Sequence, residues 1–260
     1  MTMPVATNTD PVARREALRH AVSSLEKAVP RAREGEVITL GAATLDLRLG
    51  GGLARGGLHA VHGEAAGDGA AAIGFTTLLA ARAARLGSVL WVQTVAAKRE
   101  GAALYGPGLA EVGLDPRRLT LVRAARDLDA LWAAEEALGC GALAAVVVDL
   151  HGPAEALDLT ASRRLALAAA RSGVTGLLLR TGSAAHPAAT MSRFLVAPAP
   201  SRVGPVALAL GGLGPPRFTV TLDRNRAGET GRFVLEWTRS DHAEDSDDPC
   251  FRITTGEIAR

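Results

Sequence analysis

Short apolar runs alternate with helix-length segments along most of this chain, and that alternation limits the possible folds more than any other feature. The strongest run is ALAAVVVDL at 142–150, and similar runs lie at 57–62, 88–95, 119–123 and 174–180. Runs with so few polar residues are typical of strands buried on both faces of a parallel sheet. We therefore expect an α/β fold, with a mostly parallel sheet flanked by helices.

The segments between these runs carry helix signals. Aromatic residues make up only 3% of the chain, so the core must be built from Ala, Val and Leu. We expect one helix at 70–86, stopped by Gly87, and a short one around 108–112. Two further helices are expected, one capped by Asp127 and ending at Gly139, the other capped by Thr160 and ending at Gly173.

The two ends of the chain differ from the centre. Residues 216–238 alternate apolar and polar side chains around a Gly-rich turn, which predicts an antiparallel hairpin with one apolar face that extends the sheet edge. Residues 239–260 are acidic and poor in core residues, so we expect a disordered tail, and we expect disorder at 1–10. Between them, 35–238 is expected to form one core domain.

A helix is predicted at 11–30, where Asp10 and Pro11 give a typical start. Leu18, Val22 and Leu25 recur at helical spacing and form an apolar stripe. The stripe is consistent with packing on the chain's own core or with docking on a partner, and self-association through it is one interpretation.

Composition excludes several classes of protein. The formal net charge of +2 is too balanced to require nucleic acid as a direct partner. Two cysteines, Cys140 and Cys250, give neither a disulfide framework nor a metal spacing, which favours a reducing cytoplasm. The first residues lack the apolar run of a signal peptide, and no stretch is apolar enough for a clear membrane span. His59 and His62 lie three apart on a strand and so point to opposite faces, and we expect no metal site.

The segment HGEAAGDGA at 62–70 has the outline of a phosphate-binding loop, since a strand precedes its glycines and a helix follows them. A working loop has the form G-x-x-x-x-G-K-[ST], in which the lysine reaches the outer phosphates and the hydroxyl ligates magnesium. Aligned from Gly63, the chain places Asp68, Gly69 and Ala70 at the second glycine, the lysine and the hydroxyl. Shifting the alignment by one residue places Gly69 at the second glycine, but Ala70 and Ala71 then stand at the lysine and the hydroxyl. The positions of this degenerate loop are Gly63, Gly67, Asp68, Gly69 and Ala70.

Asp149 ends the apolar run 142–150, where a magnesium-coordinating carboxylate would lie in a nucleotide site. Without a lysine or hydroxyl in the loop, Asp149 is expected to be vestigial. ATP and magnesium would be cofactors only if an unorthodox site replaced the lost groups.

Several segments resemble known proteins. One segment resembles the part of RecA-type recombinases that leads into their ATP site: LGAATLDLRLGGGLARGGLHAVHGE. LDLTASRRLALAAARSGVTGLLLR, with GLAEVGLDPRRLTLV, GALAAVVVDL and the closing GPPRFTVTLDRNRAGETGRFVLEW, is similar to the ImuA family of bacterial inducible-mutagenesis cassettes. The resemblance covers about residues 35 to 238.

The resemblance implies a RecA-like core that acts with ImuB and, through it, an error-prone C-family polymerase in SOS-induced translesion synthesis. On an ungapped match, Thr94 stands where RecA-type enzymes carry their catalytic glutamate, and threonine is no general base. The loops 151–158 and 181–190, where recombinases grip DNA, are nearly without basic residues and lack aromatics. We therefore expect a non-catalytic adaptor rather than an enzyme.

Two other functions remain open at this stage: a DNA-dependent ATPase or recombination regulator with an unorthodox nucleotide site, and a RecA-like inhibitor of cell division or of recombinase filaments. The arginines are consistent with a solvated surface or with contacts to a partner or DNA. The candidates for such contacts are Arg163, Arg164, Arg217, Arg224, Arg226 and Arg232.

Overall fold

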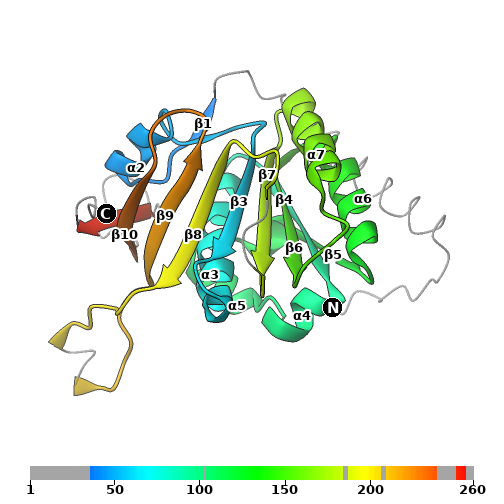
Figure 1. Cartoon of the computed structure of the whole chain (residues 1–260). Helices are drawn as coiled ribbons and strands as arrows, with labels where there is room; N and C mark the ends of the chain where they lie inside the picture. Colours follow the sequence, from blue (N-terminus) through cyan, green and yellow to red (C-terminus); the bar gives the residue numbers. More distant parts are fainter. Residues whose placement is uncertain (1–35, 102, 184–186, 206–208, 239–249, 256–260) are drawn as a thin grey trace.

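The computed structural model of the chain describes residues 36–101, 103–183, 187–205, 209–238 and 250–255 (Figure 1). Within these residues lies one large sheet, with strand order β11-β10-β9-β8-β3-β7-β6-β4-β5, and a two-stranded sheet of β1 and β2. The strands are β1 Val37–Ile38, β2 Leu53–Ala54, β3 Leu58–Gly63, β4 Ser88–Thr94, β5 Leu119–Ala124, β6 Leu143–His151, β7 Thr175–Thr181, β8 Ser192–Pro198, β9 Arg217–Asn225, β10 Gly231–Thr238 and β11 Cys250–Thr255.

The sheet is parallel from β8 through β3, β7, β6 and β4 to β5, and antiparallel from β8 through β9 and β10 to β11. The helices are α2 Ala43–Arg48, α3 Gly69–Ala84, α4 Val95–Gly101, α5 Gly106–Glu111, α6 Asp127–Leu138 and α7 Leu159–Ser172, with 3-10 turns at Ala66–Asp68 and Pro116–Arg118. α3 packs on one face of the parallel part, and α6 and α7 lie together on the other (Figure 1). The expected α/β architecture, a RecA-like core with a closing antiparallel hairpin, is confirmed.

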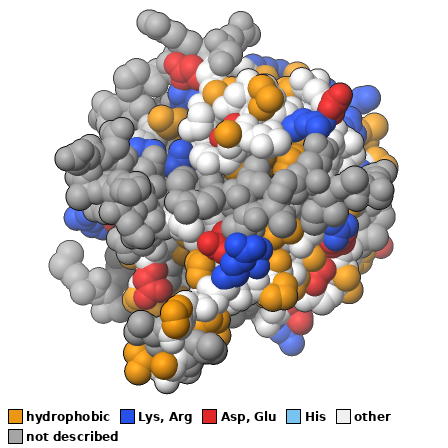
Figure 2. Space-filling view, turned by 90° about the vertical axis from the view of Figure 1, so that its left-hand side faces the viewer, with side chains coloured by type: hydrophobic (Ala, Val, Ile, Leu, Met, Phe, Trp, Pro, Cys, Tyr) orange, Lys and Arg blue, Asp and Glu red, His pale blue; other side chains and the backbone are white. Residues whose placement is uncertain are grey.

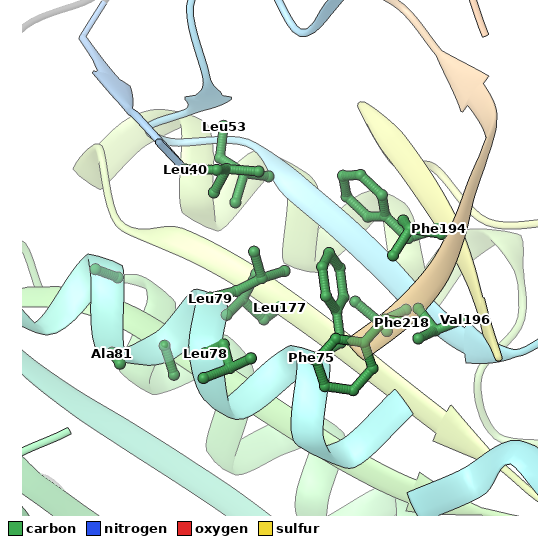
Figure 3. Close-up of a cluster of buried hydrophobic side chains, with 14 of the residues drawn as sticks. Leu40, Leu53, Phe75, Leu78, Leu79, Ala81, Leu177, Phe194, Val196 and Phe218 are labelled. Atoms are coloured by element: carbon green, nitrogen blue, oxygen red, sulfur yellow. The ribbon is translucent and has the colours of Figure 1, made fainter. Parts of the chain in front are cut away.

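Two apolar clusters fill the space between these layers. The first joins α3 to the hairpin, because Phe75 of α3 packs against Phe194 and Phe218 with ring centroids 5.6 and 6.0 Å apart (Figure 3). The second is built mainly from Ala, Val and Leu of α6, α7 and the strands beneath them. The inward side of the hairpin is apolar as expected, with Phe218, Val220, Leu222, Phe233, Leu235 and Trp237 all buried.

Several boundaries differ from those expected. The N-cap of α7 is Asp158, whose carboxylate accepts a hydrogen bond from the backbone N–H of Ala161 at 2.6 Å, and Thr160 lies inside the helix. Asp127 is the first helical residue of α6 and does not cap that helix. At this position the helix dipole stabilises its negative charge. α3 ends at Ala84, two residues short of the expected end. Gly173 does end α7, with φ 76°.

The tail also differs in part, because residues 250–255 form β11, which pairs antiparallel with β10. The expectation of disorder throughout 239–260 is therefore wrong for this segment. Its sequence CFRITT is rich in β-branched and aromatic residues, which favour strands even beside the acidic residues that precede it. The predicted N-terminal helix 11–30 and the predicted disorder at 1–10 lie outside the described residues. Among the residues that are described, no helix is long and apolar enough to cross a membrane.

Candidate functional site

The carboxyl ends of β3, β6 and β7 meet at one edge of the sheet, where the loop between β3 and α3 begins. β7 pairs in parallel with both β3 and β6, so Gly63, Asp149 and Thr181 come to neighbouring strand ends. In open α/β sheets ligands bind outside the carboxyl ends of the strands, near the point where the strand order reverses. β3 lies at such a point, because the chain continues on one side of it to β4 and later returns on the other as β8.

The loop that follows β3 is closed on itself by Asp68. One carboxylate oxygen of Asp68 accepts a hydrogen bond from the backbone N–H of Ala65 at 2.9 Å. The backbone N–H of Asp68 in turn donates to the carbonyl oxygen of Ala65 at 3.1 Å, which forms a tight 3-10 turn. A phosphate loop offers its backbone N–H groups to the ligand. Here the chain supplies its own anion to such a group, at the N-terminus of α3, where negative charge is favourable.

The glycines of the loop have different roles. A Cβ at Gly63 would lie 2.8 Å from the carbonyl oxygen of Ala65, so the close turn requires glycine there. At Gly69 a Cβ would lie 3.4 Å from the Cβ of Thr181, while Gly67 has open space around it. Ala70 is exposed in the first turn of α3 and contributes no hydroxyl. The backbone geometry of the loop is therefore adapted to the turn that Asp68 closes.

Glu64 ties this loop to the C-terminal hairpin. Its two carboxylate oxygens accept hydrogen bonds from the guanidinium of Arg232 on β10 at 2.7 and 3.1 Å. The backbone N–H of Glu64 also donates to the carbonyl oxygen of Val196 on β8 at 3.0 Å. Two-point arginine–carboxylate pairs fix orientation as well as charge. The loop is thus held on the β8 side as well as by its own turn.

Asp149 is buried, and only 2% of its surface is exposed. One of its oxygens accepts hydrogen bonds from Nε1 of Trp91 at 3.2 Å and from Nε2 of Gln93 at 3.0 Å, both on the neighbouring strand β4. Burial raises the pKa of Asp149 above its usual value, and the bonds from Gln93 and Trp91 oppose that rise. The carboxyl group is therefore engaged with β4.

Thr94 has a structural role at the end of β4. Its hydroxyl accepts a hydrogen bond from the backbone N–H of Ala97 at 3.1 Å, as an N-cap does at the start of α4. The side chain is 1% exposed. This position therefore begins a helix and presents no group that could activate a water molecule.

The loop after β6 is held against the end of β7. His151 Nδ1 lies 3.0 Å from the hydroxyl of Thr181, and the backbone N–H of Gly152 donates to the carbonyl oxygen of Thr181 at 2.8 Å. The buried guanidinium of Arg180 donates to the carbonyl oxygens of Gly152 and Pro153 at 3.2 and 2.6 Å. Arg180 and Thr181 of β7 thus fix the backbone of this loop. To bind DNA, the loop would need free backbone groups and basic side chains.

Six arginines were suggested by the sequence as contacts to a partner or DNA. Arg232 contacts this site through Glu64, and the other five lie elsewhere on the hairpin or on α7. On the hairpin, Arg217 donates to the carbonyl oxygen of Pro200 at 2.6 Å and lies 3.4 Å from Glu236, and Arg224 donates to that of Ala188 at 3.4 Å. Arg226 is exposed.

On α7, Arg164 pairs with Glu135 of α6, and Arg163 is exposed. Leu18, Val22 and Leu25 lie outside the described residues. Four of the six candidate arginines thus belong to the hairpin and two to α7, and four of the six are engaged with groups of this chain.

Sequence reasoning missed the contacts made by Arg180, Gln93 and Thr181, and did not pair Glu64 with Arg232. Gln93 had a usable signal, since it is a polar residue inside the apolar run 88–95. The Glu64–Arg232 pair had none, because its partners are 168 residues apart. No group of three or more His, Cys, Asp or Glu among the described residues is arranged to hold a metal ion.

These features define a class: a RecA-like α/β protein whose loop between β3 and α3 is closed by its own carboxylate. The chain matches no protein-family model. It is 39% identical over 207 residues to Protein ImuA from each of two strains of Caulobacter vibrioides, NA1000/CB15N and CB 15, and the match covers 74% of this chain and 80% of each relative. The chain belongs to the ImuA family.

Proposed function

We propose that this chain is a non-catalytic adaptor of a translesion-synthesis complex in the bacterial cytoplasm. It acts with ImuB and, through ImuB, with an error-prone C-family DNA polymerase in damage-induced mutagenesis. Membership of the ImuA family supports the link to inducible mutagenesis and to ImuB. The absence of a catalytic step is proposed from the loop between β3 and α3.

The observation that carries the proposal is the hydrogen bond from the Ala65 N–H to the Asp68 carboxylate. A triphosphate bound here would meet this carboxylate and that of Glu64. Hydrogen bonds to charged groups contribute about 1.5–3 kcal/mol each, and the loop lacks both the lysine and the hydroxyl that would supply them. The dipole of α3 favours an anion by about 0.3–1 kcal/mol, which does not replace them.

Nucleotide binding tests the non-catalytic part. Isothermal titration of the full chain with ATP and magnesium should give no saturable heat, and the same should hold for the Asp68→Ala variant. Removing Asp68 takes away one negative charge but supplies neither lysine nor hydroxyl, so the two proteins should behave alike. Saturable, magnesium-dependent binding by the wild type would favour the ATPase function instead.

Binding to ImuB tests the adaptor part. Full-length chain immobilised on a biosensor should bind purified ImuB with the same affinity in the presence and absence of ATP and magnesium. A chain that uses no nucleotide has no nucleotide-dependent state to switch. If the folded chain does not bind ImuB under either condition, the adaptor role is contradicted.

A further inference from the structure

The described parts of the connection between β8 and β9 project from the body of the molecule (Figure 1). We call its described parts, 199–205 and 209–216, the arm. From Val203 to Pro216 the sequence VGPVALALGGLGPP contains no charged and no hydrogen-bonding side chain, although 22% of the whole chain is charged. Leu210 and Leu213 are 82% and 91% exposed. Exposed large apolar side chains that lie close together mark interaction sites in soluble proteins.

The base of the arm is fixed, so its direction is part of the fold. The backbone N–H of Ala199 donates to the carbonyl oxygen of Arg217 at 3.0 Å, and Arg217 Nη1 donates to that of Pro200 at 2.6 Å. A Cβ at Gly214 would lie 2.3 Å from the carbonyl oxygen of Arg202, so the two limbs approach as closely as glycine allows. Figure 2 is turned about the vertical axis from Figure 1, so heights in the two views correspond. Apolar side chains gather at the lower end of the surface in Figure 2, which is the height of the arm in Figure 1.

A groove of about 260 Å³ opens at the foot of the arm. It lies between α3, the segment leading into α5 and the start of β9, and Pro216, the last residue of the arm, forms part of its wall. Its other walls include Ile73, Leu104, Leu109 and Phe218, with the exposed Tyr105 at the rim. The hydroxyl of Thr77 in the wall already donates to the carbonyl oxygen of Ile73 at 2.8 Å. With no charged residue in its lining, the groove suits an apolar occupant.

We propose that the arm of one copy of this chain seats in the groove of a second copy. The groove accepts apolar side chains, and the arm presents them without filling the groove of its own copy, as the exposure of Leu210 and Leu213 shows. Because arm and groove adjoin at Pro216, a twofold axis beside that residue lets each copy donate one arm and accept the other. Both apolar surfaces are then buried in one closed dimer. This contact is independent of the proposed binding to ImuB.

Sedimentation equilibrium of the full chain tests the proposal. The wild type should reach twice its mass of 26.8 kDa with rising protein concentration. Changing Leu210 and Leu213 together to Asp should raise the dimer dissociation constant about 100-fold or more, because two buried leucines are lost from each arm. Leu47→Asp is the matched control, since Leu47 of α2 is 78% exposed and lies in neither surface, and it should leave the constant unchanged.

Mixing two variants separates arm exchange from other modes of association. Tyr105→Asp alters the rim of the groove at a side chain that is 71% exposed, so the fold should tolerate it. Each variant alone should dimerise weakly, but a mixture of the arm variant with Tyr105→Asp should form heterodimers that contain one intact pair. A wild type that is monomeric at every concentration, or a dimer insensitive to the arm variant, overturns the proposal. It is also overturned if the wild type is monomeric and the arm variant instead loses binding to ImuB or to phosphatidylcholine vesicles.

Discussion

Asp68 shows at the scale of one residue how a loop with the outline of a phosphate-binding loop is closed as a structural turn. Its carboxylate lies beside the N-terminus of α3 and accepts the Ala65 N–H, so the charge that would repel a phosphate stabilises the turn. The same holds for Thr94, whose hydroxyl begins α4. In both cases a side chain of the candidate site has a hydrogen-bond partner within its own segment.

Asp68→Ala should lower the free energy of unfolding by about 0.5–2 kcal/mol, the usual cost of losing a capping acceptor at a helix start. Urea denaturation followed by circular dichroism measures this change. Asp68→Asn keeps an acceptor oxygen and should lose less. Equal losses in the two variants would show that the charge, and not the hydrogen bond, stabilises the turn.

His59 predicts how stability depends on pH. Its ring is fully buried, with Nδ1 2.7 Å from the Ser192 hydroxyl and Nε2 3.0 Å from the Ala54 carbonyl oxygen. Burial lowers the pKa of His59 from its usual 6.5 to about 4. The unfolded chain therefore takes up a proton on this ring at a higher pH than the folded chain does. The neutral ring's contribution is fully present above the usual pKa and is lost as the pH falls toward the folded one.

Because one pKa unit corresponds to about 1.4 kcal/mol, the loss between these two pKa values should be about 3 kcal/mol. Denaturation at a series of pH values across this window measures the slope. His59→Gln can still donate to the Ala54 carbonyl but does not titrate, so its slope should be shallower. An unchanged slope in that variant would assign the pH dependence to other groups.

Helix caps illustrate how local signals succeed and fail at the scale of one element. Gly173 ends α7 as expected, because a positive φ leaves a recognisable glycine. At the other end of α7 the segment DLT offers two capping residues, Asp158 and Thr160, and only the backbone geometry decides between them.

Asp158→Ala should cost about 0.5–2 kcal/mol of stability, because the Ala161 N–H loses its acceptor. Thr160→Ala is the matched control: this side chain is exposed within the first turn, and alanine is the better helix former. Thermal unfolding of both variants compares them directly. A larger loss for Thr160→Ala would restore the cap expected from the sequence.

The elements themselves were largely predictable, because buried parallel strands such as β6 are nearly continuous apolar runs. The strand β8, SRFLVAP, was missed, since it begins with Ser192 and Arg193 and ends at Pro198, which leaves only a short apolar run. The absence of a lysine from the loop was evident from the sequence. Its closure by Asp68 and its link to Arg232 were not, because both depend on where side chains lie in three dimensions.

At the scale of the whole molecule, α3 joins the parallel part of the sheet to the antiparallel part. Phe75 contacts Phe194 of β8, a parallel strand, and Phe218 of β9, the first antiparallel one. The loop before α3 makes a second link through the Glu64–Arg232 pair. The two parts of the sheet should therefore unfold together.

Phe75→Ala should lower the free energy of unfolding by about 3–5 kcal/mol, the usual cost of removing a buried phenylalanine. Unfolding should remain a single transition by both circular dichroism and tryptophan fluorescence, since Trp91 reports on β4 and Trp237 on β10. Two separate transitions in the wild type would show that the hairpin is an independent unit.

The closed loop also limits the paths by which this protein can change over generations. A lysine at position 69 and a threonine at 70 would still follow Asp68 directly in the chain, and replacing Asp68 first would remove the acceptor of the Ala65 N–H and weaken the turn. On the proposal that this chain binds no nucleotide, the step that removes Asp68 would thus lower stability and bring no immediate gain. New binding functions should therefore be more accessible on the outer surfaces of such a chain than at this edge of the sheet.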